Sequence, residues 1–413
     1  MIGSGIFLLP AALAPYGLLS FAGWILTAGG SIFLALVIAR LSHRTSRSGG
    51  VYIYAQDAFG DLTGFLIAWG YWAAYWISIP AIAIAFVGYL GVFIPGLDDQ
   101  PQHQAMYALA LIWVLTFINM RSLKGAGYTQ LLMTALKLIP LAIIIVLGAT
   151  NGDGANLPET NPKDVSMLGG LATTALLTMW AFSGLEAGTV PAGDVDEPQK
   201  TIPKAILLGT LTVAFVYIAS TYAVMRLVPA EVLVNSKSPF SDAAISLGQW
   251  GPHFIAAGAL ISTAGALNGV IFITGQMPMA LAIDRMAPKV LATRNASNAP
   301  YISLILGSIL GSLLLLMNYN KGLIGMFVFL AMMSTLAVLV PLLFSALADM
   351  RYSWKTSKPW IAIAMIAALY SVFAILGSGI EVIGWGLVLF AVGVPVYYWI
   401  RKTNLQAKTT DTL

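Results

Sequence analysis

The sequence contains no cysteine and few charged residues, and both absences narrow the class of protein. Without cysteine, disulfides and thiolate metal sites are excluded. The histidines, His43, His103 and His253, are far apart and fall in or near loops, so we expect no histidine-ligated metal. Charged residues make up 9% of the 413 residues, whereas soluble domains contain about 25%. With 58% hydrophobic residues, this composition predicts an integral membrane protein with little soluble mass.

Signals for an enzyme or a nucleic-acid-binding protein are missing as well. The sequence has no phosphate-binding loop, no zinc-ligand spacing and no nucleophile near a histidine. Its glycine pairs, such as Gly29-Gly30 and Gly169-Gly170, lie in or next to apolar stretches, where helix packing explains them. Basic cytoplasmic loops explain the net charge of +4. We therefore expect no enzymatic activity, no cofactor, no metal and no nucleic-acid partner.

Long apolar stretches fill most of the chain. A membrane-spanning helix needs about 20 mostly apolar residues. Twelve segments meet or approach this length, at residues 1–17, 20–42, 62–95, 104–120, 128–149, 167–192, 203–226, 252–282, 300–317, 322–347, 358–377 and 381–400. The loops between them are short, and we expect the polar tail 401–413 to be disordered. The sequence thus predicts an all-α integral membrane protein with about twelve transmembrane helices in one domain.

Basic residues are distributed unevenly between the two sides of these segments. The loops after segments 2, 4, 6, 8 and 10, together with the tail, hold 16 of the 21 lysines and arginines. The opposite loops hold Lys163, Arg226, Lys237 and Lys321. Loops rich in basic residues face the cytoplasm. We therefore expect a multi-pass protein of the cytoplasmic membrane, the inner membrane in a two-membrane cell, with a cytoplasmic C-terminus.

Two segments contain helix-breaking residues at matching places. Gly3-Ser4-Gly5 precedes Pro10 in segment 1, and Ser183-Gly184 precedes Pro191 in segment 6. A broken helix exposes backbone groups at membrane depth, which is tolerated where they line a cavity or meet a ligand. Close helix packing through the small residues is the alternative interpretation. Because the two segments are five apart, the pattern predicts two inverted five-helix repeats.

Two charged residues lie deep inside apolar segments. Lys137 follows the expected start of its helix by about nine residues, which at about 1.5 Å per residue places it well inside the hydrocarbon. Glu186 directly follows the glycine break of segment 6. Charged groups at this depth are costly and favour a functional role. A buried structural pair is the alternative.

Four groups of residues carry a resemblance to a known family. They are Gly3-Ser4-Gly5-Ile6-Phe7, Ser48-Gly49-Gly50-Val51-Tyr52-Ile53-Tyr54 with Phe59-Gly60, Phe182-Ser183-Gly184-Leu185-Glu186, and Glu197-Pro198-Gln199-Lys200-Thr201-Ile202-Pro203. Together they resemble the amino acid–polyamine–organocation (APC) superfamily. Within it the sequence is most similar to the basic amino acid and polyamine antiporters, such as the arginine/agmatine exchanger. The resemblance covers essentially the whole chain.

The resemblance implies the LeuT-type fold, in which a five-helix inverted repeat is followed by two further helices. It places the first repeat at 1–150, the second at 167–347, helices 11 and 12 at 358–400, and a cytoplasmic tail at 401–413. It also implies a substrate held at the membrane midplane between the two broken helices.

The resemblance assigns substrate-binding roles to residues of the two breaks. Ser4 and Gly5 would bind an α-carboxylate. The backbone carbonyls of Met1, Trp180 and Ser183 would bind the α-amino group. Trp180 would also stack against the substrate or close over it.

Further roles follow from matching positions in the antiporters. Tyr71 and Glu186 match gating positions. Ile79 replaces an asparagine of helix 3, and Val270 replaces a tryptophan of helix 8, whereas Ser334 in helix 10 keeps a polar match. These departures favour a neutral or more generic amino acid over a long cationic one, with Glu186 left to proton coupling.

Lys137 and the start of the chain are two further points of comparison. In several sodium-independent relatives, a helix 5 lysine places its amine where sodium binds in others. Lys137 matches this pattern, with Ser262 and Thr263 as neighbours, so we expect sodium-independent, proton-linked transport. Related chains have a half-helix before the glycine motif, whereas Met1 lies almost on it. We therefore expect the first half of helix 1 to be missing, through a late start or a truncation.

These observations predict a secondary active transporter of amino acids that works by exchange or proton coupling. Its partners would be a small-molecule substrate (amino acid or polyamine), protons and membrane lipid, and a homodimer stays open. The alternative within transport is a polyamine or basic amino acid antiporter with Glu186 as the cation ligand. An ion-translocating enzyme subunit would need more buried ionisable groups than Lys137 and Glu186. A non-transporting membrane sensor or an inactive truncated product is the alternative from another class.

Overall fold

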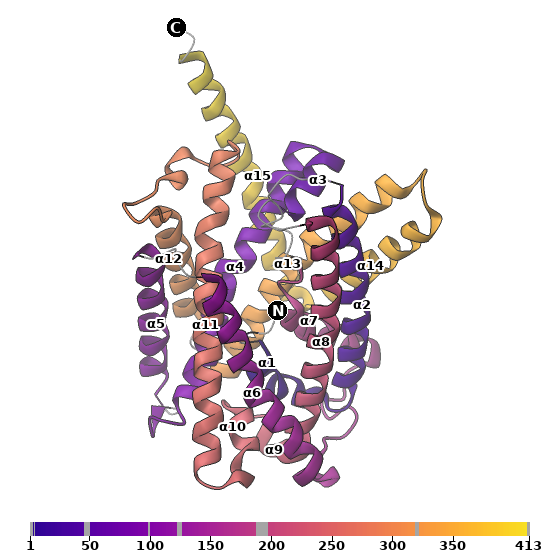
Figure 1. Ribbon diagram of the computed structural model, residues 1–413, viewed down its shortest axis with the longest axis vertical. Helices are drawn as coiled ribbons and strands as arrows, with labels where there is room; N and C mark the ends of the chain where they lie inside the picture. The colour runs from indigo at the N-terminus through magenta and orange to yellow at the C-terminus, as the bar shows by residue number, and fades with distance from the viewer. Residues whose placement is uncertain are drawn as a thin grey trace.

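The structure is a bundle of long helices (Figure 1). This computed structural model describes residue 3 and residues 5–44, 50–97, 100–121, 126–186, 197–318 and 322–410. Within these ranges it contains helices, turns and loops but no strand. The all-α prediction is therefore confirmed for the part of the chain that the structure describes.

Eight helices in the described ranges are long and apolar enough to cross a membrane. They are α2 (Leu19–Ser42), α4 (Asp61–Leu90), α5 (Pro101–Arg121), α8 (Pro198–Leu227), α11 (Trp250–Ile283), α13 (Leu323–Ser353), α14 (Lys358–Leu376) and α15 (Gly379–Thr410). Four further apolar stretches are shorter. They belong to α1 (Gly5–Leu13) with the 3-10 helix η1 (Ala14–Tyr16), α6 (Ala126–Asn151), α7 (Met167–Phe182) and α12 (Tyr301–Asn318). Each of the twelve predicted segments thus overlaps with one of these α-helices, and segment 1 also contains η1.

Several short helices in the loops were not predicted. They are α3 (Val51–Phe59), α9 (Ala230–Leu233), α10 (Pro239–Ala243) and the 3-10 helices η3 (Gly154–Asn156), η6 (Ile245–Leu247) and η7 (Lys289–Ala292). The helix α15 continues to Thr410, into the tail that the sequence analysis expected to be disordered. The sequence there, with Leu405, Gln406, Ala407 and Lys408, is rich in strong helix formers.

The packing of the helices centres on α4. This helix contacts α5, α11, α12, α13 and α15, while α2 packs against α7, α8 and α14. Counting the twelve long segments in order, α4 and α11 are the third and the eighth, and they lie against each other. Contacts also recur at an offset of five segments: α4 packs on α12 as α11 packs on α5, and α4 packs on α13 as α11 packs on α6.

The two ends of the bundle carry different loop structures (Figure 1). One end holds α3 and the connection between α13 and α14, and the last turns of α15 project beyond it. The opposite end holds α9 and α10. We refer to these as the α3 end and the α10 end.

Candidate functional site

One helix ends and another begins inside the bundle, at the two glycine motifs where the sequence predicted helix breaks. The helix α7 ends at Phe182, and Ser183 adopts an extended backbone conformation with φ −55° and ψ 137°. Gly184 follows with φ 95°, a conformation that residues with a side chain rarely adopt. The helix α1 begins at Gly5. The N-terminus of α1 and the C-terminus of α7 therefore lie within the bundle, and both contribute residues to one cavity.

This cavity has a volume of about 300 Å³ and brings most of the predicted site together. The predicted residues that line it are Gly5, Lys137, Trp180, Ser183, Glu186, Val270 and Ser334. Met1 and Ser4 lie outside the described residues, so their predicted roles stay predictions. We refer to this space as the helix-break cavity.

Glu186 lies on the cavity wall and is hydrogen-bonded to Tyr71, which in turn pairs with Tyr75. Its Oε1 accepts a hydrogen bond of 3.0 Å from Tyr71 Oη, and Tyr71 Oη lies 2.8 Å from Tyr75 Oη. Glu186 is 2% exposed. Tyr71 does not line the cavity but contacts it through Glu186, whereas Tyr75 lines it directly. The structure thus joins the two predicted gating residues and adds Tyr75, which the sequence analysis did not identify.

Lys137 extends into the same cavity from α6. Its side chain is 2% exposed, and a Cβ placed on Gly265 of α11 would lie 3.8 Å from Nζ. In the described part of the chain, no hydrogen bond or ion pair to Nζ is found. Ser262 and Thr263, the expected neighbours, lie three and two positions before Gly265 on α11, and both are buried. A helix that carries glycine at position 265 leaves room for the amine.

The indole of Trp180 lies directly over the start of α1. A Cβ on Gly5 would come within 3.0 Å of both Cδ1 and Nε1 of the ring. Trp180 is 6% exposed, and its Nε1 is buried without a hydrogen-bond partner among the described residues. The ring also makes an edge contact with Phe327 of α13, with centroids 6.4 Å apart. Gly5 is therefore required by the close approach of Trp180.

A pair of serines also lines the cavity. Ser78 Oγ of α4 lies 2.8 Å from Ser334 Oγ of α13, and both oxygens lie within hydrogen-bond distance of the Ala74 carbonyl, at 2.7 and 2.9 Å. Ser78 lines the cavity, but Ile79 does not, and a Cβ on Gly311 of α12 would meet Ile79 at 3.1 Å. The structure therefore corrects the placement of Ile79, which was expected in the substrate site. Successive residues of a helix point about 100° apart, so Ser78 faces the cavity in its place. Ser78 supplies a polar group that the comparison with the antiporters took to be lost.

At the α10 end, aromatic side chains of α1, α4 and α10 pack against one another. Phe7 of α1 makes edge contacts with Tyr89 of α4 and Phe240 of α10, at centroid distances of 5.6 and 5.4 Å. Tyr89 Oη donates to the Phe7 carbonyl at 2.8 Å and accepts from Phe240 N–H at 3.2 Å. All three side chains are fully buried. We call Phe7, Tyr89 and Phe240 the aromatic cluster.

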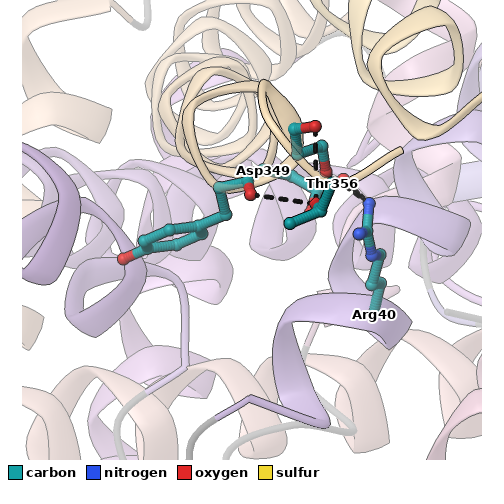
Figure 2. Close-up of polar contacts among 5 residues, drawn as sticks. Arg40, Asp349 and Thr356 are labelled. Atoms are coloured by element: carbon teal, nitrogen blue, oxygen red, sulfur yellow. Dashed lines mark hydrogen bonds and ion pairs between the residues drawn. The ribbon is translucent and has the colours of Figure 1, made fainter. Parts of the chain in front are cut away.

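At the α3 end, an ion pair joins two long helices. Arg40 of α2 reaches Asp349 of α13, with Nη1 3.3 Å from Oδ2, and also donates to Ser353 Oγ (Figure 2). The Arg40 guanidinium lies 4.5 Å from the centroid of the Trp360 ring of α14. Thr356, also drawn in Figure 2, donates to the Ser353 carbonyl at 3.4 Å, which ties the start of the α13–α14 connection to the end of α13. We call Arg40, Asp349 and Ser353 the charged cluster.

A cavity with a lysine and a glutamate on its walls, between the start of one membrane helix and the broken end of another, is typical of a secondary membrane transporter. Comparison with known proteins gives the family. The family model described as "Amino acid permease" matches residues 1–402, so the chain belongs to the amino acid permease family, which is part of the APC superfamily. It is a multi-pass membrane transporter, as the sequence predicted.

Similar curated proteins cover nearly the whole chain. The cadaverine/lysine antiporter of Escherichia coli (strain K12) is 31% identical over 424 residues, which include 100% of this chain and 94% of the relative. The putrescine transporter PotE of Haemophilus influenzae (strain ATCC 51907 / DSM 11121 / KW20 / Rd) is 29% identical, over 97% of this chain and 94% of its own length. These relatives are transporters, and nothing among them supports the membrane sensor considered from the sequence.

Proposed function

We propose that this chain carries amino acids across the cytoplasmic membrane without sodium, by exchange or by proton coupling. The observation that carries the proposal is that α1 begins, and α7 ends, at the same cavity. A helix N-terminus carries about half a positive charge and free N–H groups, and a C-terminus carries about half a negative charge and free carbonyls. The pair therefore suits the carboxylate and the ammonium group of an amino acid.

The cavity walls support the same arrangement of substrate. The carboxylate would lie at the N–H groups that open α1, near Gly5, with Ser4 as the further predicted donor. The ammonium group would lie at the carbonyls of the α7 break, at Trp180 and Ser183, with Met1 as the further predicted acceptor. Trp180, packed over Gly5, would cover the bound substrate. The predicted roles of Met1 and Ser4 rest on the sequence resemblance.

Lys137 supports independence from sodium. Its ammonium group lies beside α11, in the cavity that both helix breaks reach, and would repel a sodium ion from this position. A proton exchanged at Lys137 or Glu186 would then link transport to pH. Glu186 is suited to this role because its carboxylate faces the cavity while Tyr71 holds one oxygen.

The offset of five in the helix contacts supports two inverted repeats, at 1–150 and 167–347, followed by helices 11 and 12 at 358–400. The distribution of basic residues supports an orientation with the α3 end and the tail 401–413 in the cytoplasm. The α10 end would then face outward.

Uptake by the full chain in proteoliposomes tests the proposal. We expect uptake of radiolabelled amino acids in sodium-free buffer, stimulated by a pH gradient or by unlabelled amino acid on the opposite side. Gly5→Ala should weaken substrate affinity at least about tenfold, because the added Cβ lies within 3.0 Å of the Trp180 ring. Gly29→Ala on α2 is the matched control, since a Cβ there meets nothing within 4 Å. Uptake that needs sodium and ignores pH, or equal effects of both glycine variants, would contradict the proposal.

Antiport of a polyamine or a basic amino acid is the second candidate. It is favoured by Glu186, the one acidic residue among the described residues that line the cavity, and by the names of the relatives. In that case Glu186 would bind the cationic amine directly. Glu186→Gln should then reduce diamine binding by about 100-fold, a typical loss when a buried charge pair is broken. In an amino acid carrier, the same variant should leave affinity within a few fold and flatten the pH profile. Competition of labelled substrate by alanine, lysine and cadaverine, at several pH values, separates the two.

A further inference from the structure

A second and larger cavity lies on the outside of the bundle. It has a volume of about 750 Å³ and runs between α4, α12 and α15, with further walls from α11 and α13. Apart from Glu381, the described residues that line it are apolar or aromatic, among them Trp72, Trp76, Leu389 and Val392. We call this space the outer groove. It shares no lining residue with the helix-break cavity.

The length of the outer groove matches the membrane. On α15 its lining residues extend from Glu381 to Ile400. Nineteen helical steps of about 1.5 Å span about 28 Å, close to the hydrocarbon thickness of about 30 Å. Within the chain, the lining side chains of Trp385 and Val388 remain 53% and 52% exposed, so no segment of the described structure covers them. In a transmembrane protein, such a surface meets lipid chains.

The two ends of the outer groove differ in charge. At the α10 end, the acidic Glu381 lines it. At the α3 end, Lys289 lies between the lining residues Pro288 and Leu291, and Arg401 and Lys402 directly follow the lining residue Ile400. All three basic side chains are exposed. This end therefore presents three positive charges where the headgroups of one leaflet lie.

We propose that the outer groove binds an anionic phospholipid of the leaflet at the α3 end. Its acyl chain lies along α15, over Leu389 and Val392. Its phosphate lies at Lys289, Arg401 and Lys402. Glu381 disfavours an anionic headgroup at the opposite end, so the charges set the direction of the lipid. This site is separate from the transport cavity, and its test does not depend on which substrate is carried.

Native mass spectrometry of the delipidated full chain, with phosphatidylglycerol or phosphatidylcholine added, tests the proposal. We expect phosphatidylglycerol to bind in preference, since each basic side chain near an anionic lipid surface contributes roughly a fivefold gain in affinity. The variant Lys289→Gln/Arg401→Gln/Lys402→Gln should lose this preference. The matched control is Lys204→Gln/Lys355→Gln/Lys358→Gln, which removes three exposed basic residues that do not border the outer groove. An equal loss in both triple variants would overturn the proposal.

A second pair of variants tests the acyl-chain part independently of charge. Val392→Trp should fill the outer groove and weaken the binding of phosphatidylglycerol, whereas Leu369→Trp, on an exposed position of α14, should not. If Val392→Trp instead dissociates a dimer without changing lipid binding, a second copy covers the groove and the proposal fails. If inorganic phosphate at matched ionic strength displaces the lipid, the basic cluster is a free-phosphate site and the proposal also fails. Equal binding of the two lipids to the unmodified protein would overturn it as well.

Discussion

The helices are joined by different chemistry at the two ends of the bundle. At the α3 end, the charged cluster joins α2 to α13 through the ion pair of Arg40 and Asp349 (Figure 2). At the α10 end, the aromatic cluster joins α1, α4 and α10 through ring contacts and the two hydrogen bonds of Tyr89. We expect these two clusters to close the helix-break cavity from its two sides. A transporter with alternating access must release each closure in turn.

This difference predicts how each closure fails. Removing one member of a buried ion pair leaves the other charge without compensation, so the effect is large and abrupt. Ring contacts are individually weak and act together, so their loss is graded. The α3 end should therefore respond to single charge changes, and the α10 end to changes in side-chain volume. Because the chain has no cysteine, a single Val270→Cys in the helix-break cavity gives a clean labelling probe for either end.

The largest effect is expected for Asp349→Ala. The Asp349 side chain is fully buried and that of Arg40 is 16% exposed, so the variant leaves a poorly solvated guanidinium without its carboxylate. We expect a loss of about 3 kcal/mol in stability, measured by thermal unfolding in detergent. In the Val270→Cys background, labelling from the α3 side of the membrane should increase. Glu159→Ala, which removes an exposed acidic residue, is the control.

The double variant Arg40→Ala/Asp349→Ala sharpens this test. If the ion pair is what holds the α3 end, removing both charges should cost less than removing Asp349 alone, because no buried charge is left. Equal or additive losses would show that packing, and not charge, holds this end. The contrast between the two ends would then disappear.

A smaller effect on the opposite side is expected for Phe240→Ala. This ring is fully buried between α10 and the start of α1, and its removal opens a cavity in the aromatic cluster. We expect a loss of about 2 kcal/mol, below the usual range for buried phenylalanine because the nearby loop can partly close the space. Labelling at Val270→Cys should increase from the α10 side. Phe254→Ala, which truncates a ring that is 44% exposed, should change neither quantity. Increased labelling from the α3 side would contradict the assignment of the aromatic cluster to the α10 end.

The parts of the structure that the sequence predicted depend on local patterns. Apolar length predicted the twelve long segments, and glycine in an apolar run predicted the break at Gly184, where the backbone has a positive φ. Depth in an apolar segment identified Lys137 and Glu186, because a charge there is costly whatever its neighbours are. Each of these signals can be read within about 20 residues of the chain.

The parts that could not be predicted depend on contacts between distant segments. Phe240 lies in the short helix α10, whose sequence gives no sign that its ring meets Phe7 of α1. Whether Ser78 or Ile79 faces the cavity depends on how α4 is rotated in the bundle. In the structure Ser78 lines the cavity, and Ile79, one residue later, packs against Gly311 of α12. Arg40 and Asp349 are 309 positions apart, so their pairing follows only from the fold.

The smallest effect is expected for Tyr89→Phe, which separates hydrogen bonding from packing in the aromatic cluster. The variant keeps the ring but removes the bond to the Phe7 carbonyl and the bond from Phe240 N–H. Because these bonds lie in a water-excluded site, we expect a loss of about 1–2 kcal/mol and a modest increase in labelling of Val270→Cys from the α10 side. Tyr398→Phe, on an exposed position of α15, is the control. Tyr89→Phe could instead cause a larger loss of stability, or a larger increase in labelling, than Phe240→Ala. Polar contacts and not ring volume would then close the α10 end, and both ends would be held by polar interactions.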